Sequence, residues 1–194
     1  MSLLRLLGFG AEADAGAADR DADDTRTMRR IAAELEALPA ARARYLAAFA
    51  CILGRVAHAD SSVSAEETAK MREIVQVLGH LPAVQAVLVV EIAKNQVRLF
   101  GGTENFLVSR RFKELSTAAQ RIELLDCVFA VSAADESITV AEEGQARQIS
   151  RELGLTHEEF VAARAGYVEH VEALKAFRRQ QASAAEASGG SRRA

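Results

Sequence analysis

The sequence contains few of the residues that interrupt helices or cross-link chains. Its 194 residues include two prolines, no tryptophan and only 5% aromatic residues, whereas 49% are hydrophobic. Proline inside a helix costs about 3 kcal/mol, so a chain with only two prolines favours uninterrupted helices. The two cysteines, Cys51 and Cys127, are too few for a disulfide framework or a structural zinc site. We therefore expect an all-α protein.

A large excess of one charge and long apolar segments are also missing. The formal net charge is −3 and the pI is about 5.9, whereas a dedicated nucleic-acid binder usually has a basic surplus. No apolar run approaches the roughly 18 to 20 residues that span a bilayer. The apolar stretch in residues 1–10 is too short for a signal peptide. These observations predict a cytoplasmic protein that does not bind nucleic acid.

The first ten residues leave two interpretations open. Their apolar side chains could form one or two helical turns that give peripheral contact with the inner membrane or with a protein partner. Such a short isolated helix is marginal in water, so a frayed end is the alternative. The apolar residues concerned are Leu3, Leu4, Leu6, Leu7 and Phe9.

Composition divides the chain into three parts. Residues 1–24 form a disordered acidic N-terminal tail with the short apolar start, and residues 183–194 form a disordered tail rich in alanine, serine and glycine. A helical domain is expected over residues 25–182. Apolar spacing and turn residues within it predict helices near 28–38, from 40 to about 58, before Gly79, from Pro82 to Gly101, through Phe106 and Phe112, from Ser116 or Thr117 to about 134, and beyond Thr139 and Thr156.

Part of the domain is repeated. When the sequence is shifted by 75 positions, similar residues coincide over about thirty positions. They include the apolar positions of the first helix, the loop, the N-cap of the second helix and the glycine that follows it. This predicts a helical bundle of two pseudo-symmetric helix–loop–helix repeats. The matched pairs are Phe49/Leu124, Ile52/Cys127, Leu53/Val128, Val56/Val131, Asp60/Asp135, Val63/Ile138, Ser64/Thr139, Glu67/Glu142, Ile74/Ile149, Leu78/Leu153 and Gly79/Gly154.

The acidic loops of the two repeats have two explanations. Ser64-x-x-Glu67 and Thr139-x-x-Glu142 both fit the capping box, in which hydroxyl and carboxylate satisfy helix N-terminal amides. The alternative is a weak cation site that uses the oxygen atoms of Asp60, Glu67, Asp135 and Glu142, which would suit Ca²⁺ or Mg²⁺. One loop alone has few carboxylates, so the second explanation requires both loops to lie on one face. Glu66, Glu136 and Glu143 would then lie alongside.

Signs of catalysis are weak. None of the four histidines, His58, His80, His157 and His170, has Glu or Asp three residues before it, so the Glu-x-x-His signature of di-iron bundles is missing. Gly101-Gly102 lacks the spacing and the lysine of a phosphate-binding loop. The basic segment 109–113 is short and is expected to be a solvated face. We expect no enzymatic activity.

The doubled loop resembles a known family. Ala57-His-Ala-Asp-Ser-Ser-Val-Ser-Ala-Glu-Glu67 and Ser132-Ala-Ala-Asp-Glu-Ser-Ile-Thr-Val-Ala-Glu142 are similar to the A-x-A-D-G-x-[IV]-[ST]-x-x-E signature of the TerB family, named for tellurite resistance. A similar domain begins the DjlA-type membrane co-chaperones. Ser61 and Glu136 stand where the family has glycine, and a glycine there would allow a left-handed turn.

The resemblance implies a function. It implies an all-helical, pseudo-two-fold domain over roughly residues 40–177, with divalent-cation sites at Asp60, Glu67, Asp135 and Glu142. It also implies a role in a membrane-associated stress-response complex with protein partners. We therefore expect a non-enzymatic TerB-like module that binds Ca²⁺ or Mg²⁺ weakly. The alternative is a helical protein-interaction scaffold without metal, whose acidic loops are only helix caps.

Overall fold

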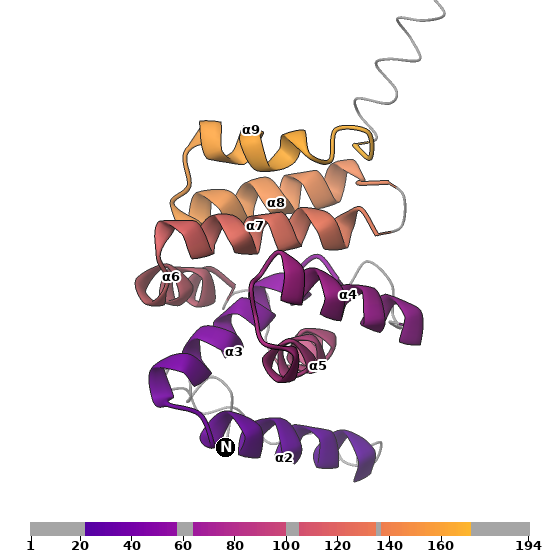
Figure 1. The fold of residues 1–194 in the computed structure, drawn as a ribbon, viewed down its shortest axis with the longest axis vertical. Coiled ribbons are helices and arrows are strands. Elements are labelled where there is room, and N and C mark those ends of the chain that lie inside the picture. Colours follow the sequence, from indigo (N-terminus) through magenta and orange to yellow (C-terminus); the bar gives the residue numbers. More distant parts are fainter. Residues whose placement is uncertain (1–21, 58–63, 100–104, 135–136, 172–194) are drawn as a thin grey trace, which may run out of the picture.

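The chain forms a layered bundle of α-helices (Figure 1). The computed structural model describes residues 22–57, 64–99, 105–134 and 137–171. Every regular secondary-structure element among these residues is an α-helix, as the sequence predicts. The helices are α2 (Ala22–Glu36), α3 (Ala40–Gly54), α4 (Ala65–Val77), α5 (Ala83–Leu99), α6 (Asn105–Leu115), α7 (Ala118–Ser132), α8 (Val140–Leu153) and α9 (His157–Ala165).

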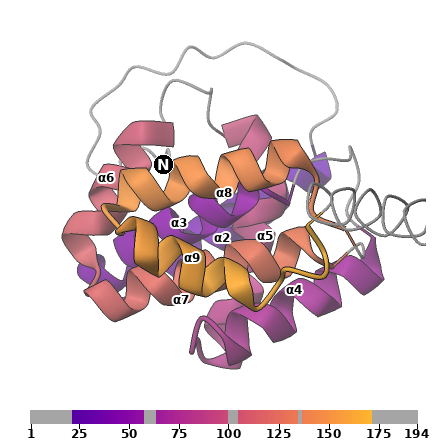
Figure 2. The ribbon, with the colours of Figure 1, turned by 90° about the horizontal axis from the view of Figure 1, so that it is seen from above.

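The two repeated segments correspond to two helix–loop–helix units, α3–α4 and α7–α8, followed by α5 and α9 respectively. α4 and α8 both begin on the same side of the molecule, at the right in Figures 1 and 2. α6 lies at the opposite side, where α7 begins and α8 ends. The bundle therefore has one side formed by the starts of α4 and α8 and another formed around α6.

Helix α3 forms the centre of the first half. The large apolar residues Tyr45, Phe49 and Ile52 recur at helical spacing, but burial is not confined to their side of the helix, because every residue from Tyr45 to Gly54 is buried. The wider burial comes from the small residues between the large ones, because alanine and glycine let neighbouring helices approach closely on the other sides. α3 packs chiefly against α5 and α6. This helix thus holds the first unit to the helices that follow it.

Each half has its own aromatic cluster. In the first half, the ring centroids of Tyr45 and Phe49 lie 5.1 and 6.0 Å from that of Phe112 on α6. In the second, the Phe129 ring lies 5.6 Å from Phe160 and 5.7 Å from Tyr167. These separations are typical of favourable aromatic pairs. The two clusters fix α6 to α3 and α9 to α7.

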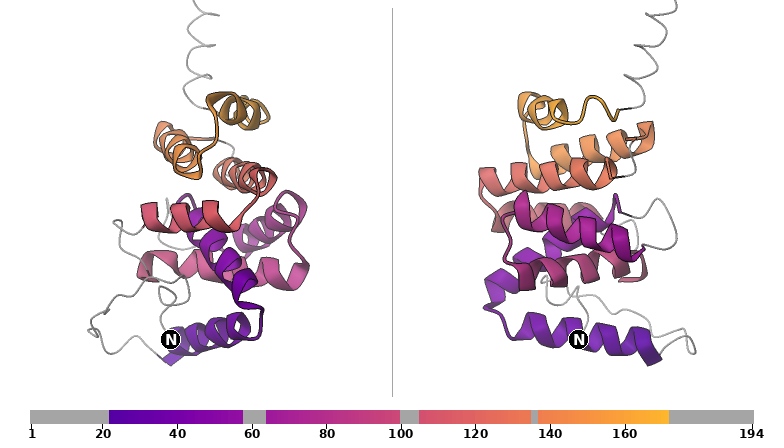
Figure 3. Two further views of the ribbon diagram at one scale, coloured as in Figure 1. Left: turned by 90° about the vertical axis from the view of Figure 1, so that its left-hand side faces the viewer. Right: turned by 45° about the vertical axis from the view of Figure 1, so that its right-hand side comes forward.

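The N-terminal helix differs from its predicted position. α2 spans Ala22–Glu36, whereas the apolar spacing predicted residues 28–38, so residues 22–24 belong to a helix rather than to the acidic tail. Ile31 and Leu35, each 1% exposed, attach it to α3 and α5. At the lower edge of the molecule, α2 is an addition to the repeated units (Figure 3).

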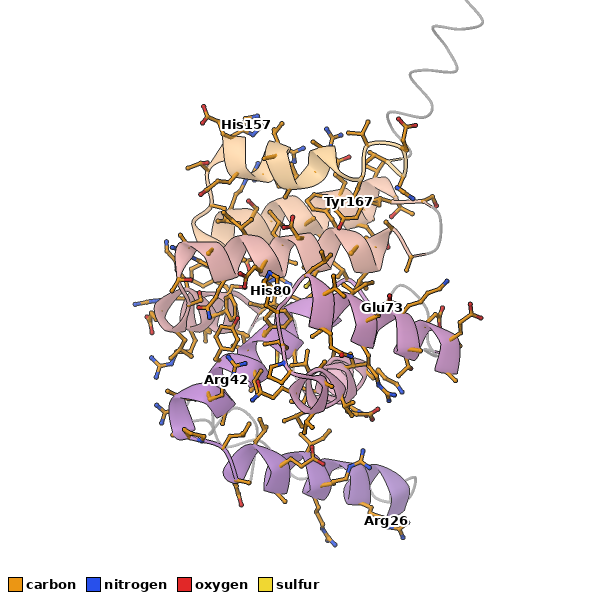
Figure 4. The ribbon with its side chains drawn as sticks, viewed as in Figure 1. Arg26, Arg42, Glu73, His80, His157 and Tyr167 are labelled. Carbon is orange, nitrogen blue, oxygen red and sulfur yellow. The ribbon has the colours of Figure 1, made fainter. Side chains whose placement is uncertain are left out.

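The two units end their second helices differently. α8 ends at Gly154, which has φ 71°, and the Leu155 and Gly154 amides donate to Ser150 and Arg151 at 3.0 Å, as in a Schellman motif. In the first unit the left-handed residue is His80, with φ 49°, labelled in Figure 4. Gly79 serves another purpose, because a Cβ there would lie 3.2 Å from Phe49 Cζ and 3.3 Å from Cys127 Sγ.

Candidate functional site

The first acidic turn begins α4 with a capping box. The Ser64 hydroxyl accepts from the Glu67 amide at 3.1 Å, and the Ser64 amide donates to Glu67 Oε2 at 2.5 Å. The bond from the Ser64 amide holds the pKa of Glu67 below its usual value. The side chain of Glu67 is therefore ionised at neutral pH and engaged through one oxygen.

The second acidic turn begins α8 in the same way. The Thr139 hydroxyl accepts from the Glu142 amide at 3.2 Å, and Glu142 Oε2 accepts from both the Thr139 amide and its hydroxyl at 2.8 Å. Ile138, fully buried, donates its amide to the His170 carbonyl at 2.7 Å. The turn before α8 is thereby attached to the chain that follows α9. The predicted capping role of both boxes is confirmed, and Thr156-x-x-Glu159 caps α9 in the same way.

The predicted metal ligands are only partly placed. Glu67 and Glu142 lie in the first turns of α4 and α8, which begin on the same side of the molecule (Figures 1 and 2). Asp60 and Asp135 lie outside the described residues, as do His58, Ser61 and Glu136. Among the described residues there is no group of three or more His, Cys, Asp or Glu side chains that could hold a metal ion. The metal site stays a prediction.

The neighbouring acids of these turns already have partners. Glu143, with its side chain 13% exposed, pairs with Arg147 at 3.2 Å and with Arg164 of α9 at 3.0 Å. The Arg147 guanidinium also lies over the Phe160 ring, 4.6 Å from its centroid. Glu66 is exposed and faces Lys70 at 3.7 Å. Glu143 therefore joins α8 to α9, whereas Glu66 remains accessible at the surface.

A buried polar cluster was not predicted from the sequence. Arg55 Nη1, just after α3, donates to Glu152 Oε2 of α8 at 2.6 Å and to Ser109 Oγ of α6 at 3.1 Å. The Ser109 hydroxyl donates to the same carboxylate oxygen at 2.6 Å. The side chains of Arg55 and Glu152 are only 3% and 8% exposed. We call Arg55, Ser109 and Glu152 the buried triad.

Two glutamines complete the hydrogen bonding of the buried triad. The Gln148 amide donates to Glu152 Oε1 at 2.9 Å. In the amide orientation that suits its neighbours, Gln145 accepts from Arg55 Nε and Nη2 at 2.8 Å. Burial raises the pKa of Glu152, but the bonds from Arg55 and Ser109 outweigh it and hold the pKa below its usual value. This arrangement joins α3, α6 and α8, and its burial makes it structural.

A departure from the repeat could have revealed the triad. Arg55 aligns with Ala130, and Glu152 aligns with Val77. At each of these two repeat positions, one copy therefore has a charged residue and the other has an apolar one. An isolated charge at an apolar helix position needs a partner, because burying it unpaired is costly. Sequence periodicity alone could not identify Ser109, which is not in either repeat.

The cysteines and histidines show no catalytic arrangement among the described residues. Cys51 and Cys127 are buried, free thiols whose pKa values burial raises. Such thiols are unreactive core side chains. His80 and His157 are exposed at helix ends (Figure 4). The backbone carbonyl of His170 accepts a hydrogen bond from the Ile138 amide.

Fold and turns together define the class of the protein: an all-α bundle with two helix–loop–helix units, in each of which an acidic capped turn begins the second helix. The family model for Tellurite resistance protein TerB matches residues 46–165, and the chain therefore belongs to the TerB family. The match begins inside α3 and leaves α2 outside it. No curated protein and no solved structure matches the chain. No helix of the described residues is long and apolar enough to cross a bilayer.

Proposed function

We propose that the chain is a non-enzymatic TerB-type module that binds a divalent cation weakly at its acidic end. The acidic end comprises the first turns of α4 and α8, with Glu66, Glu67, Glu142 and Glu143. One observation carries the proposal: both helices begin on the same side of the molecule (Figures 1 and 2). The predicted ligands Asp60 and Asp135 precede these turns in the sequence.

The capping boxes are compatible with a cation. The reach-back bonds use Oε2 of Glu67 and of Glu142, so the second oxygen of each carboxylate is the candidate ligand. Ca²⁺ accepts six to eight oxygen ligands in flexible geometry, and Mg²⁺ retains several waters. The positive end of each helix dipole opposes a cation near the first turn. The single free oxygen on each carboxylate and the opposing helix dipole together favour weak rather than tight binding of the cation.

The biological role follows from the family. The TerB family is named for tellurite resistance, and we propose that this chain serves a stress-response complex through protein partners. The cation would then adjust the charge of the acidic end at which a partner docks. No step of this role requires catalysis.

A protein-interaction scaffold without metal is the second candidate. It is favoured by the capping bonds themselves, since they account for Ser64, Glu67, Thr139 and Glu142 without any ligand. In that case the repeated motif preserves helix N-termini, and the acidic end contributes only surface charge.

A capping box elsewhere in the chain suggests a substitution that separates the two candidate functions. Thr117 and Gln120 form a capping box at α7 in which Gln120 Oε1 accepts from the Thr117 amide at 2.9 Å. Glutamine therefore keeps the cap and removes the charge. Calorimetric titration with Ca²⁺ and with Mg²⁺ should compare wild type with Glu67→Gln/Glu142→Gln. Saturable heat that is lost in this variant supports the cation site.

Two further variants complete the titration. Glu159→Gln neutralises the same kind of capping glutamate at α9, which begins on the other side of the molecule (Figure 1), and it should bind like wild type. Asp60→Asn/Asp135→Asn should lose binding while leaving the described capping bonds in place. No heat and no thermal shift for wild type at millimolar cation would leave the scaffold as the function.

A further inference from the structure

Helix α6 exposes apolar and basic side chains on one face. Phe106 is 57% exposed and Leu107 is 40% exposed, and they lie in the first turn of the helix. Arg110 and Lys113 follow them at helical spacing and are also exposed. The opposite face, with Val108, Ser109 and Phe112, is buried against the bundle. We call Phe106, Leu107, Arg110 and Lys113 the α6 face.

The exposure of these two large side chains needs an explanation. Scattered surface valines are common on proteins, but adjacent exposed phenylalanine and leucine beside basic residues are less so. α6 already satisfies the core through Phe112, which contacts the Tyr45 and Phe49 rings. Phe106 and Leu107 are therefore not needed for packing within the described residues.

The surroundings of the α6 face are also basic. The Lys113 side chain occupies the space where a Cβ on Gly154 would lie, at the end of α8, and Arg121 Nη1 donates to the Leu153 carbonyl at 3.0 Å. These cations collect at the negative end of the α8 dipole. On α6 itself, Glu114 is paired with Arg110 and Arg111, at 3.6 and 2.8 Å. One carboxylate facing three α6 cations leaves a positive surface on a chain of net charge −3.

We propose that the α6 face docks on an anionic lipid surface. Phe106 and Leu107 would insert at the boundary between headgroups and acyl chains, and Arg110 and Lys113 would contact lipid phosphates. This combination of a short apolar group with basic residues on one helix face is the pattern of interfacial helices. α6 runs across the side of the molecule that faces the viewer in the left view of Figure 3, at the periphery of the bundle. The acidic end lies on the opposite side, so docking keeps it away from the membrane charge.

Vesicle flotation of the full chain tests this proposal. Vesicles that contain phosphatidylglycerol are compared with vesicles of phosphatidylcholine alone, at low and high salt. Wild type should float with the anionic vesicles and lose most of this binding at high salt. Phe106→Ser/Leu107→Ser should weaken partitioning at least about tenfold. Arg110→Gln/Lys113→Gln should weaken it about thirtyfold.

Two control variants locate the binding. Val77→Ser/Val84→Ser removes exposed apolar side chains, 60% and 78% exposed, from α4 and α5 and should bind like wild type. Leu6→Ser/Leu7→Ser tests the apolar N-terminal stretch. Complete loss of binding in that variant, with unchanged binding of both α6 variants, would overturn the proposal. Equal flotation of wild type with neutral and anionic vesicles, or no flotation, would also overturn it. Thermal unfolding of each variant confirms that it is folded.

Discussion

The second helices of the two helix–loop–helix units share their beginnings and differ at their ends. α4 and α8 both open with a complete capping box and two glutamates in the first turn. α8 closes on a left-handed glycine, whereas α4 closes with His80 in that conformation and uses Gly79 for close packing. The buried triad has charges only at Arg55 and Glu152, with Ala130 and Val77 at the equivalent positions.

The comparison separates local from tertiary requirements. A helix N-terminus has the same unsatisfied amides wherever it lies, so the same motif serves both units. A helix C-terminus and a buried side chain meet different neighbours in each half. Those positions have therefore changed between the copies, and they are where the largest energetic differences are expected.

The buried triad should show the largest effect. Arg55→Met leaves the Glu152 carboxylate and the Ser109 hydroxyl without their shared donor, and breaking such a buried pair costs about 3–5 kcal/mol. Urea denaturation followed by circular dichroism measures this loss. Arg55→Met/Glu152→Leu should recover much of it, because no charge is then buried alone. A loss below about 1 kcal/mol for Arg55→Met would show that the triad is not a strong link between α3 and α8. Ala130→Ser, at the equivalent position of the second unit, is the matched control and should change stability little.

Alanine should destabilise the fold at both paired glycines, for different physical reasons. At Gly79 a Cβ would lie 2.6 Å from the Val75 carbonyl oxygen, and backbone there cannot move without shifting α4. Gly79→Ala should therefore destabilise the fold by about 1–3 kcal/mol. Gly154→Ala meets only the flexible Lys113 side chain but places alanine at φ 71°, which costs about 1–2 kcal/mol.

The measurement for this pair is thermal unfolding of both variants beside wild type. The additional double variant Phe49→Leu/Gly79→Ala removes part of the ring that a Cβ at Gly79 would approach. If Gly79 is limited by the backbone contact, this double variant should not recover the stability. Recovery would place the conflict at the Phe49 ring instead.

Acid should weaken the second unit through Glu152. Its pKa is lower in the folded protein than the ordinary value of 4.5, so the folded state favours the ionised form. The resulting stabilisation is present above about pH 4.5 and is lost as the pH falls through the lowered pKa of the folded state. Glu152→Gln should flatten the dependence of unfolding free energy on pH below 4.5. An identical slope for Glu152→Gln and wild type would contradict this prediction.

Much of this arrangement could be predicted from the sequence because it is local. Proline scarcity, the apolar periodicity and the S/T-x-x-E motifs correctly predicted the helical class, the two units and the capping boxes of α4 and α8. The start of α2 was misplaced because its first turns contain polar residues that carry no apolar spacing. The buried triad was missed because Arg55, Ser109 and Glu152 are 43 to 97 residues apart, and no periodic signal connects them. The candidate cation ligands Glu67 and Glu142 were placed on one side, whereas Asp60 and Asp135 lie outside the described residues.

The smallest expected effect tests the difference between the two helix ends directly. His80 has φ 49°, a conformation that costs a side-chain-bearing residue about 1–2 kcal/mol. Glycine removes this strain but increases the entropy of the unfolded chain by about 0.5–1 kcal/mol. His80→Gly should therefore stabilise the fold by about 0.5 kcal/mol, measurable as a small rise in the urea midpoint without a change in slope. His157→Gly, at an exposed residue in the first turn of α9, should instead destabilise it. A lower midpoint for His80→Gly would mean that the imidazole contributes contacts that outweigh the strain, and α4 would then end on a side-chain interaction where α8 ends on backbone freedom.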